Sequence, residues 1–322
     1  MISKFWRIGA VVFGLGLALA LAACGAGSTK DPFIPTRIVV FGDALSDTTA
    51  ATGRYTVNDP TLAAVNNWTG QVAASYGAPT IVSYAKGNAR VTAATGSGGV
   101  AVTTVTAQVA QFLAVDSFKA GDMVLINAGF SDVIAEAGGA NSTANATAYG
   151  TAYANLVRSI VTSGAKHVAV ANAYDLAKTP AAAILTNLGI LNGARGALVA
   201  AFNDALKINL GSTSLPYIGD NVRLLDIEFY FNLVYTVPAT YAFSDATTVV
   251  CDPVAANDAT AAPGGIGIGT NKINSKLCTL ANLPLAYATT YNSYVFADAV
   301  YPTPAFHRSL GSYVYGLTST RW

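Results

Sequence analysis

The sequence predicts an α/β sandwich built on a parallel sheet, and two observations predict it. Five short apolar runs are rich in β-branched residues, and their near-continuous hydrophobicity is typical of strands covered on both faces. These runs are Arg37–Phe41, Thr80–Tyr84, Met123–Asn127, His167–Ala171 and Val222–Asp226. Helical patterns alternate with them, which favours a doubly wound fold whose sites lie at the carboxyl ends of the strands.

The helical patterns are recognised by apolar residues that recur every three or four positions. The two clearest sets are Tyr153, Leu156, Val157, Ile160 and Val161, and Leu198, Phe202, Ala205 and Leu206. Such spacing places the apolar side chains on one face, which packs against a sheet. Two stretches interrupt the alternation, Val91–Thr106 and Thr247–Leu283, and we expect both to be long loops.

The first residues are typical of an export signal. Lys4 and Arg7 precede an apolar run, Ile8–Ala23, that is shorter than the roughly 20 residues of a membrane-spanning helix. The run closes on Leu-Ala-Ala-Cys at residues 21–24, which resembles the bacterial lipobox. We therefore expect residues 1–23 to be removed and Cys24 to carry a lipid. The alternative is ordinary secretory cleavage that leaves Cys24 as a free thiol.

The remaining chain is predicted to be a tether over residues 24–36 and one domain over residues 37–322. The tether is rich in Gly, Ser and Pro, and no change of composition divides the domain. A net charge of +1, with 11% charged residues, provides no basic surface for nucleic acid. We expect the membrane to be a partner through the lipid, and we expect no nucleic acid, no cofactor and no bound metal.

Two cysteines remain once Cys24 is assigned to the lipid. Cys251 and Cys278 lie in one loop-like region, and in an exported protein such a pair favours a disulfide. Closing a loop of this length stabilises a fold by about 3 to 4 kcal/mol in the chain-entropy description. Two independent thiols are the alternative.

The chemistry-bearing residues begin at the end of the first strand run. Residues 41–47 read Phe-Gly-Asp-Ala-Leu-Ser-Asp, which resembles the block Phe-Gly-Asp-Ser-Leu-Ser-Asp of the GDSL (SGNH) ester hydrolases. The resemblance implies that Ala44 stands where the family has its nucleophilic serine. Alanine keeps the backbone N–H that serves the family's oxyanion hole, but it supplies no hydroxyl to attack an ester.

Three further blocks follow in the family's order. Residues 84–90 resemble Tyr-Ala-x-Gly-Gly-Ala-Arg, residues 128–132 resemble Gly-x-Asn-Asp, and residues 296–303 resemble Phe-x-Asp-x-x-His-Pro-Thr. Gly87 matches the glycine whose N–H serves the oxyanion hole. The resemblance extends from Phe41 to Thr303, and it implies the family's flavodoxin-like three-layer sandwich with a five-stranded parallel sheet.

Two more family positions carry other residues. Ser131 replaces the asparagine whose amide donates to the oxyanion, and a serine hydroxyl is shorter. Asp298 matches the acid of the triad, but Tyr301 replaces the histidine. A phenol, with a reference pKa near 10, is a poor general base at neutral pH.

Other residues could in principle replace the missing groups. Ser46 lies two positions beyond Ala44, where a tight turn aims it elsewhere, and Ser131 could form a new hydroxyl pair with Tyr301, but no base accompanies it. His167 begins a strand run, which favours a structural role. His307 lies on a predicted C-terminal helix outside the triad.

Three functions follow from this sequence. The first is a lipid-anchored pseudoenzyme that binds an acyl, glycan or protein ligand in the family's cleft without cleaving it. The second is an ester hydrolase with a rearranged site, and the third is a structural lipoprotein of the bacterial envelope. Gly25 is not the aspartate that in some bacteria follows the acylated cysteine and retains lipoproteins in the inner membrane, so outer-membrane residence is preferred.

Overall fold

The computed structural model of the chain describes residues 32–48, 54–182, 192–212, 219–251 and 275–322. Its central feature is a five-stranded sheet in the order β2-β1-β3-β4-β5, and every neighbouring pair is parallel. The strands are β1 (Arg37–Gly42), β2 (Thr80–Ser83), β3 (Asp122–Asn127), β4 (Val168–Ala171) and β5 (Val222–Leu225). The predicted α/β fold with its five-stranded parallel sheet is thus confirmed, as are the five strand positions.

Burial separates the middle of the sheet from its edges. The strands β1, β3 and β4 are buried almost throughout, as their apolar sequences predict. The expectation of a buried strand is wrong for β2, where Ile81 is 37% exposed. An edge strand has a neighbour on one side only, so its side chains receive less cover than those of central strands.

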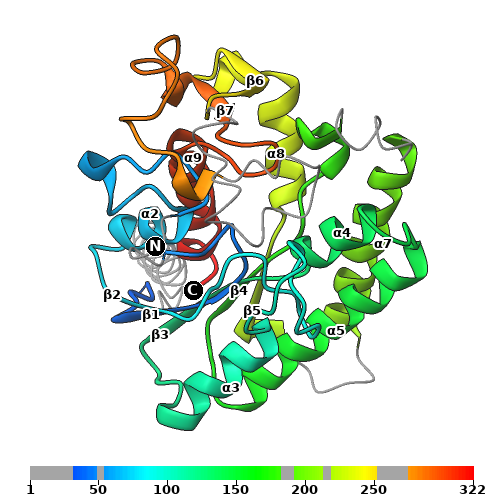
Figure 1. The fold of residues 1–322 in the computed structure, drawn as a ribbon. Helices are drawn as coiled ribbons and strands as arrows, with labels where there is room; N and C mark the ends of the chain where they lie inside the picture. Colours follow the sequence, from blue (N-terminus) through cyan, green and yellow to red (C-terminus); the bar gives the residue numbers. More distant parts are fainter. Residues whose placement is uncertain (1–31, 49–53, 183–191, 213–218, 252–274) are drawn as a thin grey trace, which may run out of the picture. The chain divides into compact units, whose positions relative to one another are not determined.

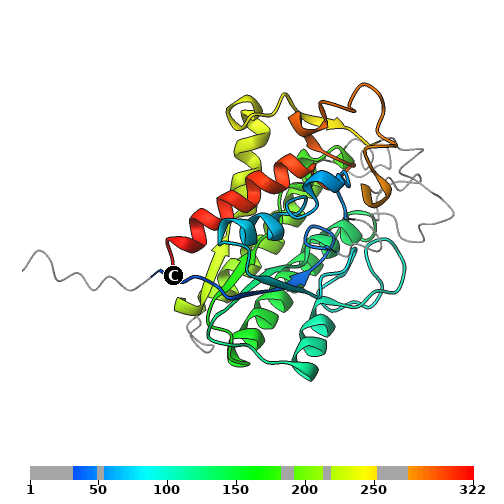
Figure 2. The ribbon, with the colours of Figure 1, turned by 90° about the vertical axis from the view of Figure 1, so that its left-hand side faces the viewer.

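Helices cover both faces of the sheet and make a three-layer sandwich (Figure 1, Figure 2). On one face α2 (Trp68–Ser75) packs against α9 (Pro304–Ser319). The other face carries α3 (Val105–Val115), α5 (Thr143–Thr162) and α7 (Asn192–Gly211). The two predicted helical patterns are confirmed as α5 and α7.

Close packing of α5 against α7 depends on one glycine. A Cβ atom on Gly150 would lie 2.3 Å from the carbonyl oxygen of Phe202, so a larger residue would push the helices apart. The Tyr153 hydroxyl on the same helix donates to the carbonyl oxygens of Ile126 and Ala171, at 2.9 and 3.2 Å. This pair of hydrogen bonds fixes α5 over the carboxyl ends of β3 and β4.

Shorter elements complete the described chain. Two helices, α4 (Phe130–Ala137) and α8 (Ile227–Thr236), follow β3 and β5. The 3-10 helices are η2 (Pro60–Leu62), η3 (Leu176–Lys178), η4 (Gly219–Asn221), η5 (Pro238–Tyr241), η6 (Ser275–Leu277) and η7 (Tyr291–Ser293). Among the described residues, none of the helices combines the length and apolar character needed to cross a bilayer.

The expectation of two long loops is only partly correct. Between β2 and α3 the chain is irregular from Val91 to Thr104, as predicted. The segment that begins at Thr247 instead starts inside a strand, β6 (Asp245–Val249), which pairs with β7 (Tyr294–Phe296) in a second, two-stranded sheet. This pairing joins residues about fifty positions apart, which a local sequence pattern does not reveal. Residues 252–274 lie outside the described part.

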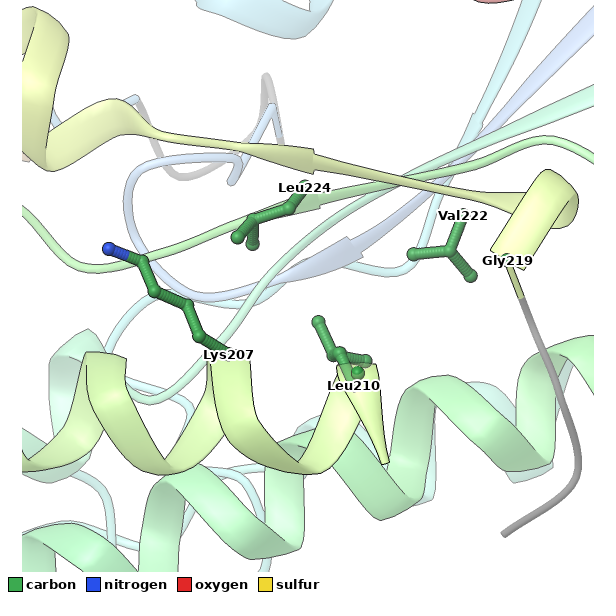
Figure 3. A pocket seen from close by; sticks show the side chains of 6 residues that line it. Lys207, Leu210, Gly219, Val222 and Leu224 are labelled. Atoms are coloured by element: carbon green, nitrogen blue, oxygen red, sulfur yellow. The ribbon is translucent and has the colours of Figure 1, made fainter. Parts of the chain in front are cut away.

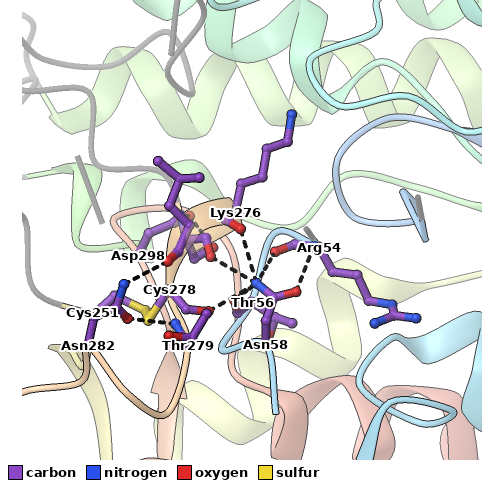
Figure 4. The surroundings of a disulfide bond; sticks show 11 residues. Arg54, Thr56, Asn58, Cys251, Lys276, Cys278, Thr279, Asn282 and Asp298 are labelled. Atoms are coloured by element: carbon purple, nitrogen blue, oxygen red, sulfur yellow. Dashed lines mark hydrogen bonds between the residues drawn. A yellow bond between two sulfur atoms is a disulfide. The ribbon is translucent and has the colours of Figure 1, made fainter. Parts of the chain in front are cut away.

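The predicted disulfide between Cys251 and Cys278 is present (Figure 4). It lies in a small separate core beside the second sheet. That core consists of buried side chains from distant parts of the chain: Val57, Val250, Cys251, Cys278, Leu283, Tyr291 and Ala297. The predicted signal, residues 1–23, and most of the tether, with Cys24, lie outside the described residues.

Candidate functional site at the carboxyl edge of the sheet

The turn after β1 is organised by a buried carboxylate. Asp43 is fully buried and its Oδ1 accepts hydrogen bonds from the backbone N–H of Leu45, at 3.1 Å, and from the Asn127 amide. Its Oδ2 accepts from the backbone N–H and the hydroxyl of Ser131, at 3.3 and 3.2 Å. Burial raises the pKa of Asp43 to about 6, because the charged form is poorly solvated. Asp43 therefore ties the turn containing Ala44 to β3 and α4.

Ala44 and Ser46 both lie in this turn, and both are buried. Ala44 is 1% exposed and Ser46 is fully buried. The Ser46 hydroxyl donates to Oδ1 of Asn127 and accepts from the indole N–H of Trp68, at 3.0 Å. Both hydrogen-bonding directions of Ser46 are thus used within the fold, which agrees with a structural role.

The backbone N–H at the predicted oxyanion position already has an anionic partner. Gly87 follows β2 and donates its N–H to Oδ2 of Asp47, at 2.8 Å. Tyr55 lies directly over the same glycine, since a Cβ atom placed on Gly87 would be 2.2 Å from the Tyr55 hydroxyl oxygen. Asp47 is 3% exposed and Tyr55 is 4% exposed. A carboxylate and a ring of the protein itself therefore occupy this position.

Ser131 opens the helix α4 and is fully buried. Its hydroxyl points to Asp43, whereas the Tyr301 hydroxyl has no hydrogen-bond partner. The alternative in which Ser131 pairs with Tyr301 is wrong. The cause is the carboxylate of Asp43, a stronger acceptor than a phenol oxygen and close to the start of the helix.

Asp298 lies in the turn after β7, and its carboxylate accepts four hydrogen bonds. Its Oδ1 accepts from the backbone N–H groups of Val300 and Tyr301, at 2.8 and 2.6 Å. Its Oδ2 accepts from the backbone N–H and hydroxyl of Ser275, at 2.8 and 2.6 Å. Burial raises the pKa of Asp298, while these hydrogen bonds act in the opposite direction. All four hydrogen bonds of Asp298 hold its own turn and the segment of Ser275.

Tyr301 fills the space beside these groups. It is fully buried, and its ring contacts the edge of Tyr55 at 5.3 Å between centroids and that of Phe130 at 6.5 Å. Burial raises its pKa well above the usual value, with nearby Asp43 adding to the effect. The phenol thus stays protonated and cannot accept a proton from a nucleophile.

The two histidines do not replace the missing base. His307, on α9, is 1% exposed, and its Nδ1 accepts from the backbone N–H of Trp68, at 3.3 Å. Burial lowers the pKa of His307 to about 3, against a weaker opposing effect of a hydrogen bond to the Tyr55 backbone. His167 precedes β4, and its ring makes an edge-to-face contact with Trp322, with centroids 5.1 Å apart. Both rings serve the fold, as the sequence indicated.

A second set of contacts holds the segment of Tyr55 in place (Figure 4). The Asn58 side-chain nitrogen lies 3.0 to 3.4 Å from five carbonyl oxygens, those of Arg54, Thr56, Ser275, Lys276 and Cys278. The Asn58 backbone N–H also donates to Cys278, at 2.8 Å. These contacts join the Tyr55 segment to the disulfide and, through Ser275, to Asp298.

Sequence reasoning missed the three residues that close this centre: Asp47, Tyr55 and Ser275. Asp47 ends the first family block, so its position was visible, but its bond to Gly87 spans forty residues. Tyr55 and Ser275 belong to no block that resembles the family. Their contacts depend on the tertiary fold, and no local signal announces them.

Metal ligands do not mark another centre in the part of the chain that the structure describes. There, no group of three or more His, Cys, Asp or Glu side chains could hold a metal ion. One cavity of about 250 Å³ lies between the end of α7 and β5, lined by Lys207, Leu210, Gly211, Gly219, Val222 and Leu224 (Figure 3). Val222 begins β5, so this cavity is at the sheet edge opposite Ala44.

Fold and centre together define a class: a three-layer α/β protein with its characteristic turns at the carboxyl edge of a parallel sheet. The GDSL-like Lipase/Acylhydrolase family pattern matches residues 38–314, and the chain belongs to this family. It is 26% identical over 241 residues to a phosphatidylcholine-sterol acyltransferase of Aeromonas hydrophila, covering 71% of this chain and 69% of that protein. A lipolytic G-D-S-L family protein of Veillonella parvula aligns at a TM-score of 0.45 with 11% identity, covering 86% of this chain and 94% of that structure.

Proposed function

We propose that this chain is a non-hydrolytic family member held at the bacterial envelope by a lipid on Cys24. One observation carries the proposal: Tyr301, at the position that the resemblance assigns to the histidine base, is fully buried with no partner for its hydroxyl. A protonated phenol in this setting accepts no proton. Ala44, at the position of the nucleophile, offers no hydroxyl for a base to activate.

Burial favours a structural role over a ligand in the former cleft. Ala44, Ser131, Asp298 and Tyr301 are all at most 1% exposed, so an acyl chain or a glycan does not reach them. The Gly87 N–H, which would bind a ligand oxygen, is taken by Asp47. A ligand that binds this N–H therefore requires both Asp47 and Tyr55 to move.

One contact favours the alternative of a rearranged hydrolase. The Ser131 hydroxyl lies 3.2 Å from Oδ2 of Asp43, and a pKa of about 6 leaves most of this carboxylate ionised at neutral pH. A serine beside a carboxylate can in principle be activated. Both groups are fully buried, however, so neither is exposed to an ester carbonyl in solution. This burial supports the structural role over the hydrolase.

The anchoring part of the proposal is supported by the sequence. Lys4 and Arg7, the apolar run and the final Leu-Ala-Ala-Cys are the features that lipoprotein export requires. Radioactive palmitate fed to expressing bacteria should label the chain, and Cys24→Ser should abolish the label. Labelling that survives in this variant would refute Cys24 as the anchor.

The test of non-hydrolysis is an assay with short p-nitrophenyl esters. Purified protein should not exceed a Ser46→Ala, Ser131→Ala, Tyr301→Phe control, because no described serine has both a base and access. Turnover well above this control would show that the protein is a hydrolase.

A restoration experiment tests whether the cleft is closed. Ala44→Ser, Ser131→Asn and Tyr301→His together return the family's side chains, but Tyr55 still covers Gly87. We expect the triple variant to stay at background and to gain activity when Tyr55→Ala and Asp47→Ala are added, because these changes uncover Gly87 and free its N–H. Activity in the triple variant alone would contradict closure by Tyr55.

A further inference from the structure

We propose that the edge of the sheet at which the strands begin rests on the bilayer that holds the lipid anchor. This inference depends on the proposed lipid at Cys24, and it adds an interaction surface and a partner, a phospholipid surface. We call this surface the tether edge, and define it by Ile34, Val115, Lys119, Lys166 and Trp322.

Two exposed aliphatic side chains belong to neighbouring segments at the tether edge. Ile34 is 68% exposed and Val115 is 79% exposed. Two residues beyond Ile34, Thr36 bonds through its backbone N–H and its hydroxyl to the Gly121 carbonyl, just before β3. Arg37 forms an ion pair with Asp116, the residue after Val115. The entry of the tether and the end of α3 are therefore neighbours.

The C-terminus adds an aromatic residue to the same edge. Trp322 packs on His167, immediately before β4, and its indole N–H donates to the Asp220 carbonyl, just before β5, at 2.8 Å. Figure 2 shows the chain end beside the start of the sheet. Tryptophan is enriched at membrane–water interfaces, because it has both an apolar ring and a polar N–H.

Tether length favours the proposed orientation over the opposite one. The ten residues Cys24–Phe33 reach at most about 35 Å when fully extended. A compact domain of about 290 residues has a diameter of about 50 Å. If the carboxyl edge rested on the membrane, the tether would have to run extended along most of the domain, whereas at the tether edge it needs only a short path. Tether length therefore favours the tether edge.

The charges of this edge neither oppose nor dominate the contact. Lys119 and Lys166 are exposed, and Lys119 pairs with Asp116 at 3.3 Å. Because acidic and basic groups are mixed, the contact should depend on Ile34, Val115 and Trp322 more than on salt. The lipid keeps the edge at high local concentration near the surface, so a weak contact suffices.

In the proposed orientation the carboxyl edge of the sheet faces away from the bilayer. The turns that contain Ala44 and Gly87 follow the carboxyl ends of β1 and β2, so they also face away from the bilayer. Leu285, which is 93% exposed in the loop between the disulfide and β7, belongs to the part of the chain after β6 and not to the tether edge.

The experiment uses the mature lipidated chain in vesicles of phosphatidylethanolamine and phosphatidylglycerol. Removal of residues 1–23 takes away Trp6, so the remaining tryptophans are Trp68 and Trp322. A lipid with a nitroxide on its headgroup should quench Trp322 and spare Trp68, which is fully buried. Most of the quenching should be lost in Trp322→Phe and in Ile34→Asp with Val115→Asp, while flotation with the vesicles is retained.

A matched control places a tryptophan at the opposite edge. Lys86, exposed after β2, is changed to Trp in the Trp322→Phe background, and this Lys86→Trp protein should float without quenching. Flotation without quenching of Trp322, or equal quenching at position 86, would overturn the docking while leaving the anchor intact. Failure to float would overturn both. Ester hydrolysis would refute the non-hydrolytic proposal and leave the docking result unaffected.

Discussion

The candidate site has two halves whose polar groups are engaged in different ways. The oxyanion half contains Asp43, Ala44, Gly87 and Ser131. In this half the backbone N–H of Gly87 donates to Asp47. The acid–base half contains Asp298, Tyr301 and His307. Here the position of the base carries a buried phenol, and the carboxylate holds the loop that ends at the disulfide.

The comparison indicates which residues of the family blocks stabilise the fold. Asp43 links three segments of chain, so it is needed whether or not an ester is cut. Asp298 has a comparable role, because through Ser275, which belongs to no family block, it holds a distant segment. We therefore expect loss of the Asp298 contacts to cost more stability than loss of the single Asp47–Gly87 contact, and four experiments test this comparison.

The largest effect should be the pH dependence contributed by His307. Its pKa falls from 6.5 to about 3 on folding because the ring is buried, so the unfolded state takes up a proton first. The stability contributed by neutral His307 is present above pH 6.5 and is lost as pH falls, by up to about 5 kcal/mol near pH 3. Urea unfolding from pH 7 to 4 should show a flatter profile for His307→Asn than for the unmodified protein.

Asp43 acts in the opposite direction over part of this range. Burial raises its pKa from 3.8 to about 6, so the folded state binds the proton first. Its contribution to stability therefore grows as pH falls from 6 to 4 and is lost again as pH rises.

For His307, identical pH profiles of the unmodified protein and His307→Asn would contradict the buried, neutral histidine.

The second effect is the loss of the Asp298 clamp. Asp298→Ala leaves three backbone N–H groups and the Ser275 hydroxyl without an acceptor, and we expect a loss of about 4 kcal/mol. Unfolding in urea at pH 7 measures it. Asp298→Asn retains one carbonyl oxygen and should lose less. A loss below that of Asp47→Ala would reverse the order of the two halves.

The third effect belongs to the disulfide. Cys251→Ser with Cys278→Ser opens a loop with a sequence separation of 27 residues, and the expected loss is about 3 kcal/mol. Limited proteolysis should then cut first near residues 54–58, because Asn58 holds this segment to Cys278. Cleavage elsewhere with the segment protected would show that Asn58 suffices without the disulfide.

The smallest effect is expected for Asp47→Ala. It removes one acceptor from the Gly87 N–H, which lies in a partly exposed loop where water can replace it, so the loss should be about 1 kcal/mol. Thermal unfolding measures the change, with Asp47→Asn as the conservative control. A loss of several kcal/mol would mean that Asp47 holds the oxyanion half as firmly as Asp298 holds the other.

Much of the fold was predictable because its signals are local. Residues 37–41 and 123–127 are apolar and β-branched, the helix of Tyr153 has regular spacing, and the two late cysteines suggested their own bond. β6 was missed because its partner β7 is distant in sequence. In the same way, the residues at the family positions were visible in the sequence. Their closure by Tyr55, Asp47 and Ser275 was not, because it arises from contacts between segments far apart.

The most direct test of the central claim is covalent labelling of purified protein with a fluorophosphonate, which reacts with activated serines. After digestion and mass spectrometry we expect no labelled serine, because Ser46 and Ser131 are buried and Ala44 has no hydroxyl. Stoichiometric labelling of Ser46 or Ser131 would contradict it and identify the nucleophile of a working hydrolase.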